Sequence, residues 1–515
     1  MKFLKKIILL FIASLLFSCK DYLDEKPYSF LSDENFPAKA ADGRIALNGA
    51  YRVFQNANII GYAYLLNTLS DTDFGSFGAS LSNSYGLYQD FQRSSADGFP
   101  KSVWTDLYKA INTCNSVIDN VTEKNFDGGD QIIAEAKALR AYFYLDVTNH
   151  FGDAPLRKHK TNGVNEVNLP RATVDEIRAF ILQDLNESET IMKSYPAEFA
   201  VHNRGGDITL GAVKMMKAKL HMYMAGWRRS SKGEMIPGDP SHWTSVRDLC
   251  LEIINMGIYK LDPDYTKVFK DYYLDVYNKE SIWEIDFSMP AYGSTLPTAM
   301  TAPPYGSTSA GGFANMRTTS QFYNSFDALD TRRDWSIGSG SFSGYTFVPS
   351  PSGVSSRPYI NKYRKVLGIG FFAARTAQNN PIYRYSEVLL MLAEALNEIN
   401  KAPTQDAYAA INAVRYRARP ADHKNDGVAL PDLAGLNYTS FKQSIENERA
   451  FELAFEGQRR MDLIRWGIFM QKLQSFPDAT TGMHKSQNVR EYHMLMPIPL
   501  DEFNLNPEWS QNLGW

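Results

Sequence analysis

Two irregular stretches of the chain, residues 71-101 and 288-357, hold the side chains best suited to binding a ligand. Both are rich in Gly, Ser, Asn and Pro, yet both also carry many aromatic residues. A tyrosine or tryptophan ring offers a flat apolar face and a polar edge, which suits stacking against a sugar ring while its hydroxyl groups are bonded at the rim. Long loops are usually functional or disordered, and the aromatic content argues against disorder. We therefore predict that these loops bind a ligand non-covalently.

The predicted ligand-contacting residues all come from these two stretches. They are Asp73, Phe74, Phe77, Tyr85, Tyr88, Tyr292, Tyr305, Phe313, Arg317 and Trp335. The charged members would supply hydrogen bonds beside the rings. For each aromatic residue taken alone there is a structural alternative, because a ring can equally pin its own loop to the helical body. Trp104 illustrates this alternative, since it follows helical spacing with Leu107 and Ile111.

No motif in the sequence indicates catalysis. Glycoside hydrolysis needs two carboxylates about 5 to 9.5 Å apart, and a chain with 57 acidic residues leaves such a pair open. The sequence has no GxSxG elbow, no phosphate-binding loop and no GxGxxG after a strand. Its eight histidines show no HExxH or other tight ligand spacing, so we expect no catalytic metal. Calcium binding by Asp71 and Asp73 is a minor alternative.

The densest charged cluster spans residues 446-465. Glu452, Glu456 and Arg459 fall on one face of a predicted helix, as do Glu456 and Arg460. This spacing predicts ion pairs within the helix and to its neighbours. Bidentate pairs between arginine and carboxylate would account for the cluster without acid-base chemistry.

The first 25 residues predict export and a lipid anchor. A basic start precedes the apolar run 7-17, and Ser18 and Cys19 follow. This order is typical of a secretory signal, and a cysteine at the cleavage site predicts lipidation. We expect residues 1-18 to be removed, Cys19 to carry a diacylglycerol and an acyl chain such as palmitate, and residues 19-37 to act as a linker. An ordinary signal with an incidental cysteine is the alternative; the apolar run is too short for a spanning helix.

Composition excludes some classes of partner and site. The net charge is −3 and no basic run follows the signal, so we expect no nucleic acid partner. Cys114 and Cys250 sit in apolar helical patterns without CxxC spacing, which predicts small buried thiols and no disulfide framework.

The elements that must position the loops are mainly helices. Helical periodicity covers residues 38-55, 103-121, 136-145, 173-192, 210-226, 243-256, 385-399, 405-417 and 441-473. Capping boxes of Thr173 with Glu176 and of Ser440 with Gln443 would fix two helix starts. Short strands are predicted at 281-287 and 359-363. Short connections such as 400-404 favour antiparallel helix hairpins, so we predict an all-α, tetratricopeptide-like α-solenoid with long irregular loops.

Five segments of the chain closely resemble motifs of the SusD/RagB family, in the family's order. They are residues 135-144 with 151-156, 383-395, 411-418, 448-467 and the tail 497-512, which departs from the pattern at Leu513 and Trp515. The resemblance implies that residues 38-515 form one SusD-like domain, lipid-anchored at the outer membrane and exposed on the cell surface. It also implies capture of an oligosaccharide and a SusC-like TonB-dependent β-barrel transporter as partner.

The same resemblance leaves the ligand open. The matching motifs belong to the scaffold, and ligand residues of the family lie in variable loops, so no numbered residue here inherits a binding role. A glycan receptor without catalysis is our leading hypothesis. The alternatives are a peptide receptor of the same family, a glycoside hydrolase, and a structural lid without a ligand site of its own.

Overall fold

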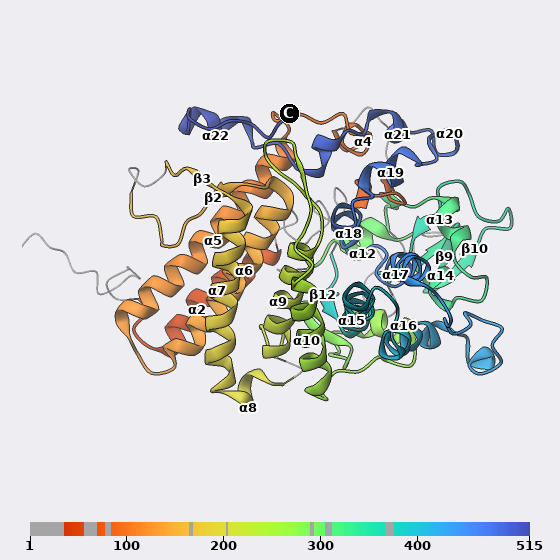
Figure 1. Cartoon of the computed structure of the whole chain (residues 1–515), viewed down its shortest axis with the longest axis horizontal. Coiled ribbons are helices and arrows are strands. Elements are labelled where there is room, and N and C mark those ends of the chain that lie inside the picture. Colours follow the sequence, from red (N-terminus) through yellow and green to blue (C-terminus); the bar gives the residue numbers. More distant parts are fainter. Residues whose placement is uncertain are drawn as a thin grey trace, which may run out of the picture.

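The computed structural model describes residues 36–55, 69–77, 84–163, 168–201, 204–288, 293–303, 312–365 and 375–515. Long helices build the body of the molecule, in orange to green for the N-terminal half and in blue for the C-terminal half (Figure 1). They are α2 (Ala40–Arg52), α5 (Gly98–Lys124), α6 (Gly129–Phe151), α7 (Val174–Lys193), α9 (Leu210–Ala225), α10 (His242–Asn255), α15 (Tyr385–Asn400), α16 (Gln405–Ala418) and α17 (Tyr438–Glu452). The mainly helical fold is thus confirmed.

Successive helices pack as neighbours, which places α5 beside α6, α6 beside α7, α9 beside α10 and α15 beside α16. The predicted helix at 173-192 starts as expected, because Thr173 and Glu176 form a reciprocal capping box. The capping box predicted for Ser440 is wrong. Asn437 is the N-cap of α17, and Ser440 is the third helical residue that bonds back to it.

The single helix predicted for residues 441-473 is also wrong. α17 ends at Glu452, a turn occupies residues 453-458, and the chain resumes as α18 (Arg459–Arg465) and α19 (Phe469–Gln474). Phe455 and Gly457 both have positive φ in this turn, which a helix cannot continue through. Glu456 and Arg460 therefore do not share a helical face.

Smaller helices frame the loops and the C-terminal segment. They are α4 (Ser84–Gln89), α8 (Pro196–Phe199), α11 (Tyr265–Tyr273), α12 (Leu296–Met300), α13 (Ser320–Ser325), α14 (Thr331–Ser336), α20 (Asp478–Thr481), α21 (Lys485–Asn488) and α22 (Leu500–Leu505). The segment from α19 to α22 runs along the top of the molecule in Figure 1.

The described strands are short and form small antiparallel sheets. One sheet has the order β1 (Ser76–Phe77), β7 (Met316–Arg317), β11 (Tyr359–Ile360), β8 (Ile337–Gly338). Two-stranded pairs join β9 (Gly340–Ser343) to β10 (Thr346–Pro349), β6 (Ser281–Ile285) to β12 (Asn380–Arg384), β2 (Ala154–Pro155) to β3 (Arg171–Ala172), and β4 (Arg228–Arg229) to β5 (Met235–Ile236). The predicted strands at 281-287 and 359-363 are therefore present but shorter.

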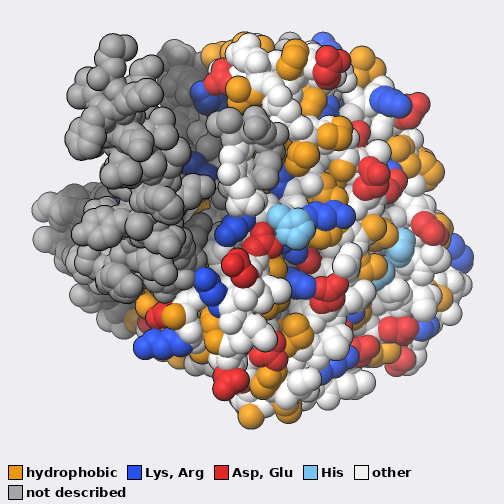
Figure 2. All heavy atoms as spheres, turned by 90° about the vertical axis from the view of Figure 1, so that its left-hand side faces the viewer, with side chains coloured by type: hydrophobic (Ala, Val, Ile, Leu, Met, Phe, Trp, Pro, Cys, Tyr) orange, Lys and Arg blue, Asp and Glu red, His pale blue; other side chains and the backbone are white. Residues whose placement is uncertain are grey.

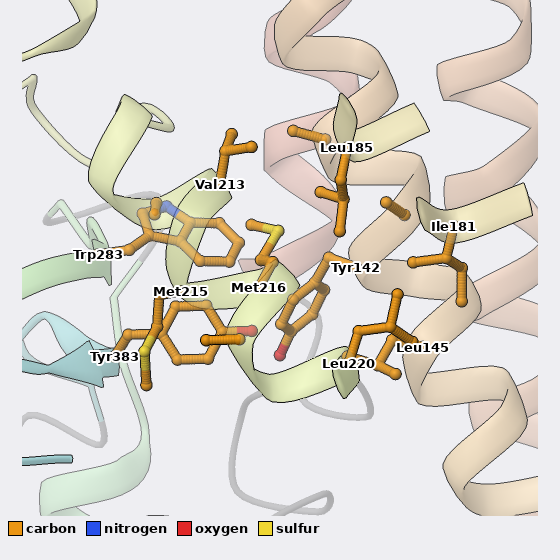
Figure 3. Packing of buried hydrophobic residues seen from close by; sticks show 14 of the residues in the cluster. Tyr142, Leu145, Ile181, Leu185, Val213, Met215, Met216, Leu220, Trp283 and Tyr383 are labelled. Atoms are coloured by element: carbon orange, nitrogen blue, oxygen red, sulfur yellow. The ribbon is translucent and has the colours of Figure 1, made fainter. Parts of the chain in front are cut away.

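Two hydrophobic cores hold these parts together. The larger core lies among the long helices and β6, where the Trp283 ring meets the rings of Tyr142 and Tyr383 at centroid distances of 5.2 Å and 5.9 Å (Figure 3). The second core lies beneath the irregular stretches and includes Phe74 and Phe322. Cys114 and Cys250 are free and buried, as expected.

In the ranges given above, none of the helices combines the length and the apolar character needed to cross a membrane. On the face seen in Figure 2, acidic, basic and apolar side chains are interspersed.

Candidate functional site

The four-stranded sheet turns one face toward the second core. Met316, Ile337 and Ile360 are each at most 1% exposed and belong to that core. Ile360 and Ile337 lie directly opposite each other on neighbouring strands. Because side chains alternate between the two faces of a strand, the adjacent residue on each strand points the other way.

A row of directly opposed residues occupies this second face. Ser76 pairs with Arg317, Arg317 with Tyr359, and Tyr359 with Gly338. The Arg317 guanidinium lies 4.5 Å from the centre of the Tyr359 ring. Gly338 leaves room for Phe347 of β10, whose ring would come within 2.6 Å of a Cβ atom at that position. Glycine here therefore allows the β9-β10 hairpin to pack against the row.

Further half-buried rings extend this surface. Tyr345, Phe347 and Tyr359 pack around the buried Phe342 ring. Arg364 lies 4.1 Å from the Trp335 ring centre and 5.8 Å from that of Phe347, and the Trp335 ring also packs against the second core. We refer to these half-buried side chains together as the aromatic face: Arg317, Trp335, Tyr345, Phe347, Tyr359 and Arg364. It lies among α13, α14, β9 and β10 at the right of Figure 1.

Of the predicted ligand residues, Arg317 and Trp335 belong to the aromatic face. Phe313 is described and 69% exposed. Phe77 lies on β1 and Tyr85 on α4, and only their backbones are described. Tyr292, Tyr305 and Cys19 lie outside the described residues.

Phe74 and Tyr88 correct the prediction, because both are buried. The Phe74 ring stacks on Phe322 at 4.1 Å, and Phe455 packs against it edge-on. The Tyr88 ring is 3% exposed and lies against Phe99 and the Arg93 guanidinium. Both rings pack against buried neighbours and pin their loops, which was the structural alternative, and Phe74 also lines a hollow of about 340 Å³ beside Asp73.

Asp73 has a structural partner that the sequence did not indicate. Its two carboxylate oxygens accept hydrogen bonds from Arg459 Nε at 2.9 Å and Nη2 at 2.7 Å. Burial alone would raise the pKa of Asp73, but the charge and hydrogen bonds of Arg459 outweigh it and lower the pKa. Asp73 also lines a polar hollow of about 340 Å³ together with Gln321 and Lys472.

Asp71 is likewise paired. Its carboxylate accepts from Arg93 at 2.8 Å and from Arg460 at 3.3 Å. The calcium alternative for Asp71 and Asp73 therefore finds both carboxylates occupied by arginine. Across the described ranges, no group of three or more His, Cys, Asp or Glu side chains is arranged to hold a metal ion.

Members of the aromatic face that were not predicted as ligand residues are Tyr345, Phe347, Tyr359 and Arg364. Tyr345 was one of many aromatic residues noted in its stretch, and Tyr359 was predicted only as the start of a strand. The signal for Phe347 and Tyr359 was weak, because each lies in a strand of only four or two residues, too short to show a clear alternation. The register of the sheet is what brings these rings together.

The charged cluster around α17 is a scaffold of buried ion pairs, as predicted. Glu452 accepts from Arg384 at 2.9 Å and Arg332 at 3.1 Å, and also from Arg417. Burial alone would raise the pKa of Glu452, but these three guanidinium groups hold the pKa well below its usual range. These contacts to other elements confirm the predicted pairs with neighbours, whereas the predicted pairs along one helix through Glu456 are absent from the described residues because α17 ends at Glu452.

A cavity of about 560 Å³ lies elsewhere, between the β2-β3 strands and the residues that follow α22. It is lined by one aromatic ring, Trp509, whose indole N–H donates to the Leu169 carbonyl at 3.1 Å. The aromatic face offers several rings and two guanidinium groups, so we take it as the candidate site.

Comparisons with known proteins agree with this architecture. A model described as "SusD family" matches residues 355–515, and one described as "Starch-binding associating with outer membrane" matches residues 21–203. SusD-like protein P25 of Formosa agariphila is 28% identical, with 98% of each chain covered.

Two solved structures share the fold. A SusD homolog from Bacteroides thetaiotaomicron has a TM-score of 0.82 at 24% identity, covering 94% of this chain and 98% of that one. Surface glycan-binding protein A from the same organism, in complex with laminarihexaose, has a TM-score of 0.71 at 22% identity, covering 92% and 99%. The family models match both ends of the chain and the relatives span its length, so the chain belongs to the SusD/RagB family.

Proposed function

We propose that this protein binds a glycan at the aromatic face and has no catalytic activity of its own. The observation that carries the proposal is the set of fixed, half-buried rings of Tyr345, Phe347 and Tyr359 beside guanidinium donors. Rings supply stacking surface for sugars, and the guanidinium groups supply hydrogen bonds at the rim. The structural likeness to a protein solved with laminarihexaose supports the same class of ligand.

The acidic residues near this face support binding over hydrolysis. Asp330 is buried and paired with Arg332, and Asp334 is paired with Arg333. A hydrolase needs two carboxylates free to act on one glycosidic bond. Carboxylates engaged by arginine are poorly placed for that role.

We further propose that the bound glycan passes to a SusC-like TonB-dependent β-barrel transporter. Cys19, with its diacylglycerol and acyl chain, would hold the protein at the outer face of the outer membrane beside that transporter. The family description "associating with outer membrane" supports this location. Affinity should be modest, on the order of micromolar to millimolar, because the glycan must also be released.

Calorimetry with the purified protein and a panel of glycans tests the binding proposal. We expect at least one glycan to bind without being cleaved, and Tyr359→Ala to weaken it. Tyr195→Ala is the matched control, since Tyr195 begins α8 on the opposite side of the molecule (Figure 1). Release of shorter products would contradict the absence of catalysis, and a lack of binding to any glycan would favour the lid or peptide alternatives.

Membrane fractionation of Cys19→Ala tests the anchor. We expect the variant to leave the membrane fraction, because a protein without its lipid chains has no hydrophobic anchor. Retention of the variant with the membrane would argue against lipidation. Co-purification with a TonB-dependent barrel from the native membrane tests the partner.

A further inference from the structure

The arginines of this molecule differ in whether a carboxylate faces them. Arg140 meets Asp184 through two hydrogen bonds of 2.8 Å, and Arg465 meets Glu394 at 2.6 Å and 2.8 Å. Arg449 and Arg384 are paired in the same way. Within the described ranges, Arg317 and Arg364 of the aromatic face form no ion pair of this kind.

Arg317 has donors to spare. One Nη1 hydrogen bond to the Arg357 carbonyl is long, at 3.4 Å, and its Nε finds no acceptor among the described residues. The Arg317 guanidinium also lies over the Tyr359 ring, which attracts a cation without neutralising its charge. Burial and the charge of Arg317 lower the pKa of Arg357, and Asp90 opposes them. Positive charge is thus concentrated here.

Among the described residues, the groups that accept hydrogen bonds from Arg364 are neutral carbonyls. Arg364 donates to the carbonyls of Asn361, Asp334 and Trp335 and lies over the Trp335 ring. Burial lowers the pKa of Arg364 to about 10, which still leaves it charged at neutral pH. The guanidinium therefore keeps a full positive charge without a carboxylate to balance it.

The sequence around the face contains few acidic residues. In the stretch 288-357 the acidic residues are Asp327, Asp330 and Asp334. Asp330 and Asp334 are paired with arginines, and Asp327 accepts the backbone N–H of Leu329. Of the segments that interrupt the described ranges, 164-167 contains Glu166, and 56-68, 78-83, 202-203, 289-292, 304-311 and 366-374 contain no Asp or Glu.

We propose that the glycan bound at the aromatic face is anionic, carrying sulfate esters or uronate carboxylates that pair with Arg317 and Arg364. This inference rests on the proposed function and specifies its ligand class. A guanidinium fork matches the oxygens of a carboxylate or sulfate and forms charge-assisted hydrogen bonds with them. The rings between the two arginines would stack on the sugar that carries the group. Neutral glycans would leave both charges unbalanced and should bind less well.

Affinity electrophoresis and calorimetry with four probes test the inference. Dextran and dextran sulfate form a pair that differs in sulfation, while polygalacturonate supplies uronate and laminarin is a neutral comparison. We expect dextran sulfate or polygalacturonate to bind at least tenfold more tightly than dextran and laminarin, with affinity falling as salt rises. The two anionic probes distinguish sulfate from uronate.

Arg317→Gln should weaken binding of the anionic probe by about 10- to 100-fold, since a hydrogen bond to a charged group is lost. Arg364→Lys keeps the charge but removes the fork, so we expect an intermediate loss. Arg333→Gln is the control, because Arg333 is already paired with Asp334, the next residue on α14. Thermal unfolding of each variant verifies that it is folded.

Three results would overturn the inference. Preferential binding of a neutral glycan would overturn it and leave the proposed function intact. Equal losses in Arg317→Gln and Arg333→Gln would show that binding follows overall charge. A lack of binding to these probes and to every glycan of the wider panel would reject the proposed function as well.

Discussion

Two arginine-rich regions of the molecule, the α17 network and the aromatic face, differ in which groups surround the arginine side chains. In the α17 network, Arg332, Arg384 and Arg417 converge on the single carboxylate of Glu452. At the aromatic face, Arg317 and Arg364 meet rings and carbonyl groups. The comparison separates charge that holds the fold from charge that is left for a ligand.

The physical basis of this distinction is that an arginine side chain stays protonated even when it is buried. A buried carboxyl without a partner can take up a proton and become neutral, whereas a guanidinium stays protonated in proteins. An arginine without a carboxylate therefore keeps its attraction for an anion. Where such arginines also border half-buried rings, the combination favours a ligand over a structural contact.

The largest effect is expected from breaking the α17 network. Arg384→Met should lower the free energy of unfolding by about 3 to 5 kcal/mol, because it leaves Glu452 and Glu280 short of a buried partner. Denaturant unfolding measures the change. Arg333→Met, which breaks a more exposed pair, should cost about 1 kcal/mol or less. Similar losses in both variants would remove the distinction between the two regions.

Asp146 sharpens the comparison by supplying the opposite case, a buried carboxyl without an ion-pair partner. One of its oxygens accepts no hydrogen bond from any described group, and burial raises its pKa to about 7, with Lys219 opposing. The unfolded chain releases this proton first, at a pKa near 4. Stability should therefore fall as pH rises from about 4 to about 7, and this loss should be complete above the folded pKa.

Asp146→Asn should remove that loss. We expect the variant to be more stable than the natural chain at pH 8, by up to roughly 4 kcal/mol, and the difference to shrink as pH falls toward 4. Unfolding curves across this pH range measure the effect. A difference that does not change with pH would mean that Asp146 is ionised in the folded protein.

The smallest effect is expected at a single ring of the aromatic face. Tyr345→Ala should weaken glycan binding about two- to tenfold, because one stacking surface is lost while the guanidinium groups stay. Its free energy of unfolding should change little, since Tyr345 is only half-buried. Calorimetry with Tyr195→Ala as control measures this effect. A large loss of stability would show that the ring pins its loop.

The helical scaffold could be predicted from the sequence because its signals are local. The start of α7 follows from Thr173 and Glu176, which bond each other within one turn. The extension of a helix through residues 453-458 failed because the apolar pattern continues there although Phe455 and Gly457 reverse the backbone. Periodicity reports which side chains face inward, and it does not report such a turn.

The candidate site was predicted only in part. The stretch 288-357, found from composition, holds four of the six residues of the aromatic face, and Arg317 and Trp335 were among the residues named; Tyr359 and Arg364 lie beyond it. Phe74 and Tyr88 come from the other stretch, which has a similar composition, yet both rings are buried. Whether a loop ring points inward or outward depends on neighbours that are distant in the chain, such as Phe455 for Phe74.

The sequence by itself determined the helical scaffold, because helix starts and apolar periodicity depend on short spacings. Only the tertiary structure decided which charges are balanced. Asp73 and Arg459 lie 386 residues apart in the chain and form a pair, while Arg317 meets Tyr359 through the register of a small sheet. Balance of charge depends on distances in space, and no local pattern of residues encodes them.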